Sequence, residues 1–103
     1  MEKQIVSPLP VRLKQARKVM GISQKELGVR LGMEEGTASA RMNHYEKGRH
    51  TPDYLTLKRI AAELNVPVAY FFCESEVMAE LMVKLGSMDE EEIKAILIQL
   101  ESS

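Results

Sequence analysis

Two short helical segments joined by a tight turn, within residues 22–46, constrain the fold of this chain more than any other feature. The first segment has a strong start signal at Ser23 and Glu26. At this spacing the serine oxygen can accept the Glu26 N–H while the carboxylate reaches back, which is a capping box. Gly32 closes the segment, and a second helix is expected over about residues 35–47. The chain is therefore predicted to turn sharply between two helices that pack on each other.

The second of these helices has two different faces. One face is expected to be buried, because Ala38, Met42 and Tyr45 recur at helical spacing. The opposite face carries small and hydrogen-bonding side chains, at Thr37, Ala40, Arg41 and His44. A helix pair that presents such a face outward has the layout of a DNA-reading helix-turn-helix.

The remaining residues also show helical periodicity, and no period-two strand pattern is visible. A first helix is predicted from about residue 9 to Gly21, and a fourth, capped by Thr51 or Asp53, up to residue 65. Pro67 is expected to open a short fifth helix at its first position. Two further helices are predicted over residues 75–85 and 87–100, with Ser75 and Ser87 as caps. The residues expected to fill the core near the fifth helix are Val66, Phe71 and Phe72.

The net charge of −1 hides an uneven distribution along the 103 residues. Residues 1–60 hold 12 Lys and Arg against 6 Asp and Glu, giving +6. Residues 61–103 hold 2 against 9, giving −7. A basic front half and an acidic back half indicate one surface for a polyanion and another surface for something else.

Several classes of protein fit the sequence poorly. The single cysteine, Cys73, excludes an internal disulfide and suits a reducing, cytoplasmic compartment. No apolar stretch approaches the roughly 20 residues of a membrane span. His44, His50 and Cys73 match no zinc-ligand spacing, and we see no phosphate-binding glycine loop and no nucleophile elbow. We therefore expect no enzyme activity, no metal, no cofactor and no membrane insertion.

From about residue 9 to residue 72 the chain resembles the lambda Cro/cI-type, or Xre, helix-turn-helix family. The resemblance rests on residues that occur in order at compatible spacing: Leu13, Arg17, Gly21, Ile22, Ser23, Gln24, Glu26, Leu27, Gly32, Tyr45, Glu46, Gly48, Pro52, residues 57–64, Val66 and Phe72. It implies an all-α fold, with a five-helix lambda-repressor-like DNA-binding domain followed by a C-terminal helical pair. The expected organisation is an N-terminal arm (1–8), the DNA-binding domain (9–73) and an acidic helical tail (74–103).

The resemblance also assigns roles to individual residues. In such a fold the second helix crosses the DNA backbone and the third enters the major groove. Arg17 and Glu46 match positions that form an inward salt bridge. The base-reading candidates are Thr37, Ser39, Ala40, Arg41, Asn43 and His44. The phosphate-binding candidates are Gln24, Lys25, Lys47, Arg49 and His50.

One feature departs from the family pattern. The family usually has about nine residues between the turn glycine and the aromatic residue before the glutamate, whereas Gly32 and Tyr45 are 13 positions apart. The four extra residues equal about one helical turn. They either lengthen the front of the third helix or enlarge the turn over residues 33–36, so that the helix begins at Thr37. Glu34 and Glu35 suit a helix amino end but would repel phosphates.

The acidic tail has apolar residues at helical spacing that need a cover: Met78, Leu81, Met82, Ile93, Ile96 and Leu97. They either fold back on residues 55–72 or pair with a second copy. We favour a homodimer, because twofold dimers read two half-sites of a palindromic operator. The main hypothesis is therefore a dimeric repressor that binds double-stranded DNA. The alternative is an antitoxin-like module whose tail binds and neutralises a protein partner while the chain autoregulates its operon.

Overall fold

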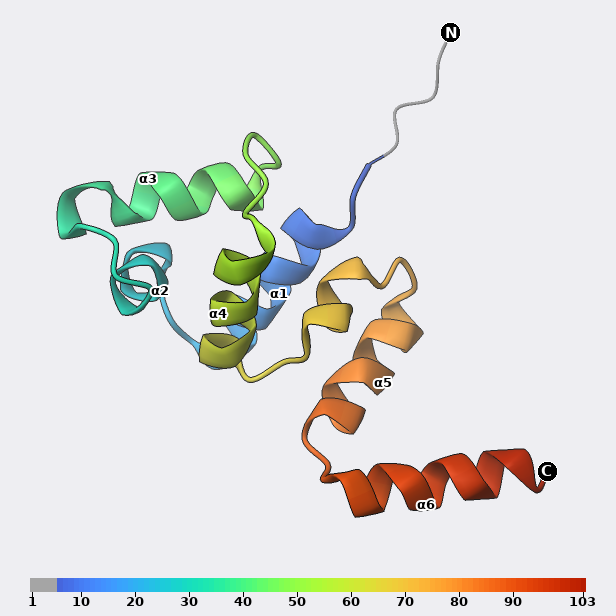
Figure 1. The fold of residues 1–103 in the computed structure, drawn as a ribbon. Helices are drawn as coiled ribbons and strands as arrows, with labels where there is room; N and C mark the ends of the chain where they lie inside the picture. Colours follow the sequence, from blue (N-terminus) through green and yellow to red (C-terminus); the bar gives the residue numbers. More distant parts are fainter. Residues whose placement is uncertain (1–5) are drawn as a thin grey trace, which may run out of the picture.

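The computed structural model describes residues 6–103, and every regular element in this range is a helix. Figure 1 shows the first four helices and a short 3-10 helix gathered in one body, with a fifth helix beside them and the last helix leading away. The all-α prediction is confirmed, while residues 1–5 of the predicted arm lie outside the described residues. The elements are α1 (Leu9–Met20), α2 (Gln24–Arg30), α3 (Glu35–Glu46), α4 (Tyr54–Leu64), η1 (Val68–Phe72), α5 (Glu76–Gly86) and α6 (Glu90–Glu101).

The capping box predicted at the start of α2 is only half formed. The Ser23 hydroxyl accepts the Glu26 N–H at 3.0 Å. The Glu26 carboxylate does not reach back, because it pairs with Arg30 one turn later at 2.9 Å. A complete capping box forms instead at the start of α6, between Asp89 and Glu92. Charged side chains within one turn therefore compete with the cap for the same carboxylate.

Three other expectations about helix ends need correction or are now decided. The prediction of Ser87 as a cap is wrong, because Asp89 caps α6 while the Ser87 hydroxyl donates to the Lys84 carbonyl oxygen at 2.8 Å. Asp53, of the two candidates, caps α4 through the Thr56 N–H. Pro67 is the residue before η1 rather than its first residue.

The hydrophobic core draws at least one large side chain from each element of the body. The largest fully buried side chains are Leu13, Leu27, Met42, Ile60 and Phe71. The prediction that Phe72 fills the core is wrong, since it is 55% exposed. The tight 3-10 turn of η1 directs Tyr70 and Phe71 inward and leaves Phe72 outside. One core therefore sets the position of the α2–α3 pair.

A buried arginine ties the start of α1 to the junction between η1 and α5. The Arg12 side chain is 97% withdrawn from solvent and donates to the carbonyl oxygen of Cys73 at 2.8 Å and to that of Glu74 at 3.2 Å. It also donates to the Glu76 carboxylate at 2.8 Å. Ala79, one turn further along α5, is buried in the common core. The beginning of the acidic tail is therefore fastened to the body, whereas α6 buries no residue.

Candidate nucleic-acid interface

Helices α2 and α3 are in close contact at Gly28 and Ala38. A Cβ atom added there would lie 2.7 Å from the Ala38 Cβ and 3.1 Å from the Ala38 backbone. Only glycine fits this contact without a shift of one helix. The small residues at Gly28 and Ala38 therefore decide how α3 lies across α2.

The four extra residues lengthen α3 rather than the turn. The connection occupies residues 31–34, and the helix begins at Glu35 and continues for 12 residues. The Glu35 carboxylate lies 2.9 Å from the Lys25 ammonium of α2. This hydrogen bond and charge lower the pKa of Glu35 below its ordinary value. The front of the extended helix is thus held by an exposed ion pair.

The other end of α3 is anchored by Glu46. Arg17 of α1 donates to its two carboxylate oxygens at 2.6 and 3.1 Å. The Gln24 amide donates to the same carboxylate at 3.1 Å, and Arg17 also donates to the Ile22 carbonyl oxygen at 2.8 Å. The structure therefore brings together Arg17 and Glu46 and adds Gln24, a residue assigned from the sequence to phosphate binding. Three helices meet at one buried carboxylate.

The base-reading candidates lie on the side of α3 that turns away from the core. Thr37, Ser39, Ala40 and Arg41 are exposed, whereas Asn43 and His44 are half-buried. The Asn43 oxygen accepts from the Gln24 amide at 3.2 Å. The Gln24 amide nitrogen is thus occupied by Asn43 and Glu46, which leaves it turned toward α3 rather than toward solvent.

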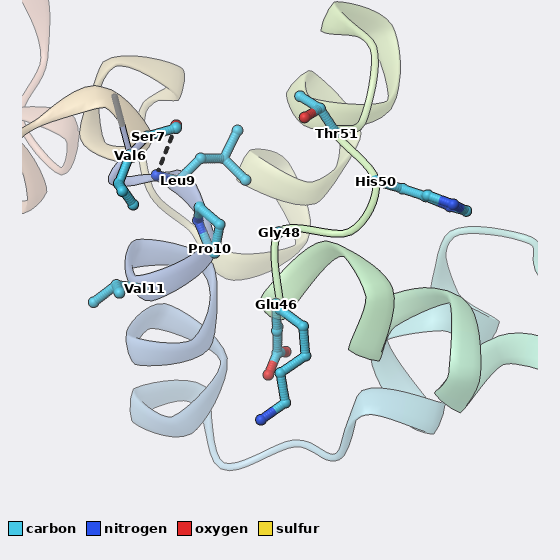
Figure 2. Close-up of a pocket in the computed structure, with 10 residues that line it drawn as sticks. Val6, Ser7, Leu9, Pro10, Val11, Glu46, Gly48, His50 and Thr51 are labelled. Atoms are coloured by element: carbon cyan, nitrogen blue, oxygen red, sulfur yellow. Dashed lines mark hydrogen bonds between the residues drawn. The ribbon is translucent and has the colours of Figure 1, made fainter. Parts of the chain in front are cut away.

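The phosphate candidates outside α2 follow the end of α3. Lys47, Arg49 and His50 are exposed, and the ring of His50 lies edge-on to that of His44 with centroids 5.0 Å apart. A cavity of about 620 Å³ lies between this loop and the start of α1. Figure 2 shows its wall formed by Val6 and Pro10 on one side and Gly48 and Thr51 on the other. It is an open hollow beside the basic loop.

Metal-ligand clusters and membrane-spanning helices are absent from the described part of the chain. No cluster of three or more His, Cys, Asp or Glu side chains in residues 6–103 is arranged to hold a metal ion. No helix in the same range has the length and apolar character needed to cross a membrane. The arrangement of α2, α3 and the loop after it is one of positioned surface polar groups.

Comparison with known proteins agrees with this geometry. A helix-turn-helix family model matches residues 13–71. Two helix-turn-helix-type transcriptional regulators, from Sinorhizobium medicae and Rhizobium meliloti, are each 36% identical over 61 residues. The match covers 59% of this chain and only 41% of each relative.

A solved structure resembles almost the whole chain. It is the crystal structure of the transcriptional regulator BswR, with 44% sequence identity and a TM-score of 0.85. The likeness covers 92% of this chain and 94% of that one, so it includes the tail as well as the body. The family match and the packing of α3 across α2 lead to one conclusion: this chain belongs to the lambda Cro/cI-type (Xre) family of helix-turn-helix transcriptional regulators.

Proposed function

We propose that the chain is a sequence-specific, double-stranded DNA-binding regulator that acts in the cytoplasm as a dimeric repressor at a palindromic operator. The observation that carries the proposal is the row of side chains on the outward face of α3. The helix itself is held at both ends by contacts with neighbouring helices. Ala38 packs against Gly28 of α2 near its front, and Arg17 pairs with Glu46 at its back. A rigid helix with an exposed polar face is what the major groove accepts.

Within this proposal the residues of α3 divide by what they reach. Arg41 binds guanine through its two-pronged guanidinium, and Ala40 contacts a thymine methyl group. Thr37, Ser39 and His44 lie beside them. Asn43 and Gln24 act as a joined pair, since one hydrogen bond links their side chains. Such a pair can present the remaining Asn43 N–H groups to a base while the helix start of α2 faces a phosphate.

The basic residues around this row supply the electrostatic part of binding. Lys47, Arg49 and His50 follow α3 in the loop that ends beside the cavity of Figure 2. Lys25 also contacts the DNA backbone once a phosphate displaces the Glu35 carboxylate from its ammonium group. Contacts of this kind position the protein on any sequence and make binding sensitive to salt.

The test is enrichment of bound duplexes from a random library with the full chain. We expect an inverted repeat whose half-sites lie about 10–10.5 base pairs apart, centre to centre. A variant with Thr37, Ala40 and Arg41 exchanged for different side chains should enrich a different sequence or none. Failure of the unchanged protein to enrich any sequence at low salt would contradict the proposal.

We assign the dimer interface to the C-terminal tail because the apolar residues of α6 are largely uncovered. Truncation before Met88 removes α6, which buries no side chain, and so leaves the core intact. We expect a folded monomer with weaker operator binding, because a single unit contacts only one half-site. A truncated protein that still sediments as a dimer and binds equally well would overturn this part.

A second candidate function is favoured by the same uncovered face of α6. An antitoxin-like regulator would use it to bind a different protein. The discriminating experiment is co-expression with the product of a neighbouring small gene. Formation of a stable one-to-one complex through α6, with relief of growth arrest, would support the second candidate over the first.

A further inference from the structure

Helix α6 has an apolar stripe that its own chain leaves largely uncovered, with Ile93 and Ile96 only half-buried. No residue of α6 is buried, and Leu97 and Leu100 are 54% and 68% exposed. In Figure 1 the helix leaves the body beyond the end of α5. A 12-residue helix is marginal without a packing partner. The stripe consists of Ile93, Ile96, Leu97 and Leu100, at positions i, i+3, i+4 and i+7.

A matching apolar groove lies on the body, between α1 and α5. Two adjoining hollows of about 240 and 550 Å³ share Val19, Tyr70 and Val83. Val19 is 90% exposed on the rim. An apolar groove between two helices is a typical acceptor for a third amphipathic helix. The other apolar residues of the smaller hollow are Ala16, Met20, Leu64 and Val66.

The turn between α5 and α6 directs α6 away from this groove in its own chain. Gly86 ends α5 directly against Pro67, where an added Cβ would lie 2.6 Å from the proline Cδ. The Met88 N–H then donates to the Leu85 carbonyl oxygen at 3.1 Å, and the Asp89 capping box starts α6. The chain thus holds both a groove and a helix suited to it, separated by a fixed turn. Two copies can satisfy both by exchanging α6.

Charge favours this exchange over pairing of α6 with α6. Residues 89–101 carry five acids and one lysine, a net charge of −4, so two such helices repel each other. The groove has Lys18 on α1 and Lys84 on α5 along its edge. Of the two acids there, Glu76 is paired with Arg12, and Glu80 lies one turn before Lys84. The acidic helix therefore meets two lysines at the edge of the groove, whereas a second α6 offers it one lysine, Lys94, among five acids.

We propose that α6 of each protomer docks, through its apolar stripe, in the α1–α5 groove of a second copy. The inference rests on the proposed dimeric function and specifies its interface. In this dimer α6 of one protomer contacts α1 of the other, and α1 is the helix that also carries Arg17. The spacing of the two α3 helices follows from how far each α6 reaches.

Cross-linking of the full chain tests the contact. Cys73 is buried, so the native cysteine is retained in all of these variants. The double variant Val19→Cys/Leu97→Cys should form disulfide-linked dimers under mild oxidation, whereas each single variant should stay monomeric on a denaturing gel. Dimers from Leu97→Cys alone would indicate an α6–α6 seam and overturn the proposal. An internal disulfide in the double variant, detected as a monomer without free engineered thiols, would indicate folding back within one chain and also overturn it.

A second experiment introduces a charge into the proposed contact instead of a disulfide bond. Leu97→Glu should weaken the dimer by roughly tenfold to a hundredfold in sedimentation, because it places a charge in the apolar contact. Gln99→Glu adds the same charge outside the stripe and should have little effect. Equal effects, or a wild-type chain that is monomeric at every concentration, would refute the interface. Enrichment of DNA is scored separately, so loss of the interface with DNA reading retained is distinguishable from failure of the regulator itself.

Discussion

Glu46 at the end of α3 accepts two hydrogen bonds from Arg17 of α1, at 2.6 and 3.1 Å, with both side chains largely withdrawn from solvent. The first helix thereby sets the orientation of the helix proposed to read DNA. Desolvation offsets most of the attraction in such a pair, so its main effect is on geometry.

Breaking this pair on one side should cost more than removing both partners. Arg17→Met leaves the Glu46 charge buried and should lower the free energy of unfolding by about 3–5 kcal/mol. The double variant Arg17→Met/Glu46→Leu should recover most of that stability and still bind operator DNA weakly, since α3 has lost its anchor. Urea unfolding and operator titration measure the two effects. Equal destabilisation in the single and double variants would show that the pair acts through packing alone.

Arg41 and Lys47 should separate base reading from phosphate binding. Arg41→Ala should relax the preference at one base pair per half-site by about 1–3 kcal/mol. Lys47→Ala should weaken specific and random DNA alike and reduce the slope of log affinity against log salt by about 1. Competition titrations on single-base operator variants measure both. Uniform weakening by Arg41→Ala would assign this arginine to the backbone instead.

Glu35 should restrain binding by occupying Lys25, which lies 2.9 Å away. Glu35→Gln frees the lysine for a phosphate, so affinity for any duplex should rise and the salt slope should steepen by about 0.9. Glu34→Gln removes a negative charge at the adjacent position and is the matched control. We expect its effect to be smaller. Identical salt slopes for the two variants would mean that Lys25 stays away from DNA.

The contact between Gly28 and Ala38 should be sensitive to a single methyl group. Gly28→Ala pushes α2 and α3 apart, because the new Cβ would lie 2.7 Å from the Ala38 Cβ, and should cost about 1–3 kcal/mol of stability. Adding Ala38→Gly in the same chain should restore part of it. Gly36→Ala, where an added Cβ meets nothing within 4 Å, is the control and should be neutral or stabilising. Thermal unfolding of the four proteins decides the matter.

The Arg12–Glu76 contact should appear in the pH dependence of stability. Hydrogen bonds from Arg12 and Gln15 lower the pKa of Glu76 below its ordinary value of 4.5. A carboxyl group with a depressed pKa in the folded state contributes stability above pH 4.5, and that contribution is lost as the pH falls through the folded pKa. Glu76→Gln should therefore lower the urea midpoint at neutral pH and converge with the unchanged protein in acid. Glu80→Gln, on the same helix, should follow the unchanged protein throughout.

Signals that act within one helical turn were readable from the sequence. Gly21 adopts the left-handed conformation expected of a helix end, and Ser23 caps α2. The apolar spacing of Ala38 and Met42 correctly identified the buried face of α3. These features depend on neighbours no more than four positions away, so local propensity is sufficient to predict them.

Side-chain partners that lie far along the chain could not be read from sequence patterns. Arg12 is buried against the carbonyl oxygen of Cys73, which lies 61 positions away, and no local pattern marks this cation as buried. The Gln24 amide nitrogen donates to Asn43 and Glu46, 19 and 22 positions away. Nothing local distinguishes an inward amide from an outward one, since its direction depends on which acceptors the fold brings near.

The sequence by itself determined the helical class, the helix positions and the family, because capping, periodicity and the ordered motif are all written in neighbouring residues. Only the tertiary structure decided that the four extra residues extend α3, that Arg12 fastens the tail, and that α6 fully buries none of its residues. The physical reason is that these outcomes depend on which surfaces remain after one core has formed. Core packing is a property of all the helices together, so no single helix carries it.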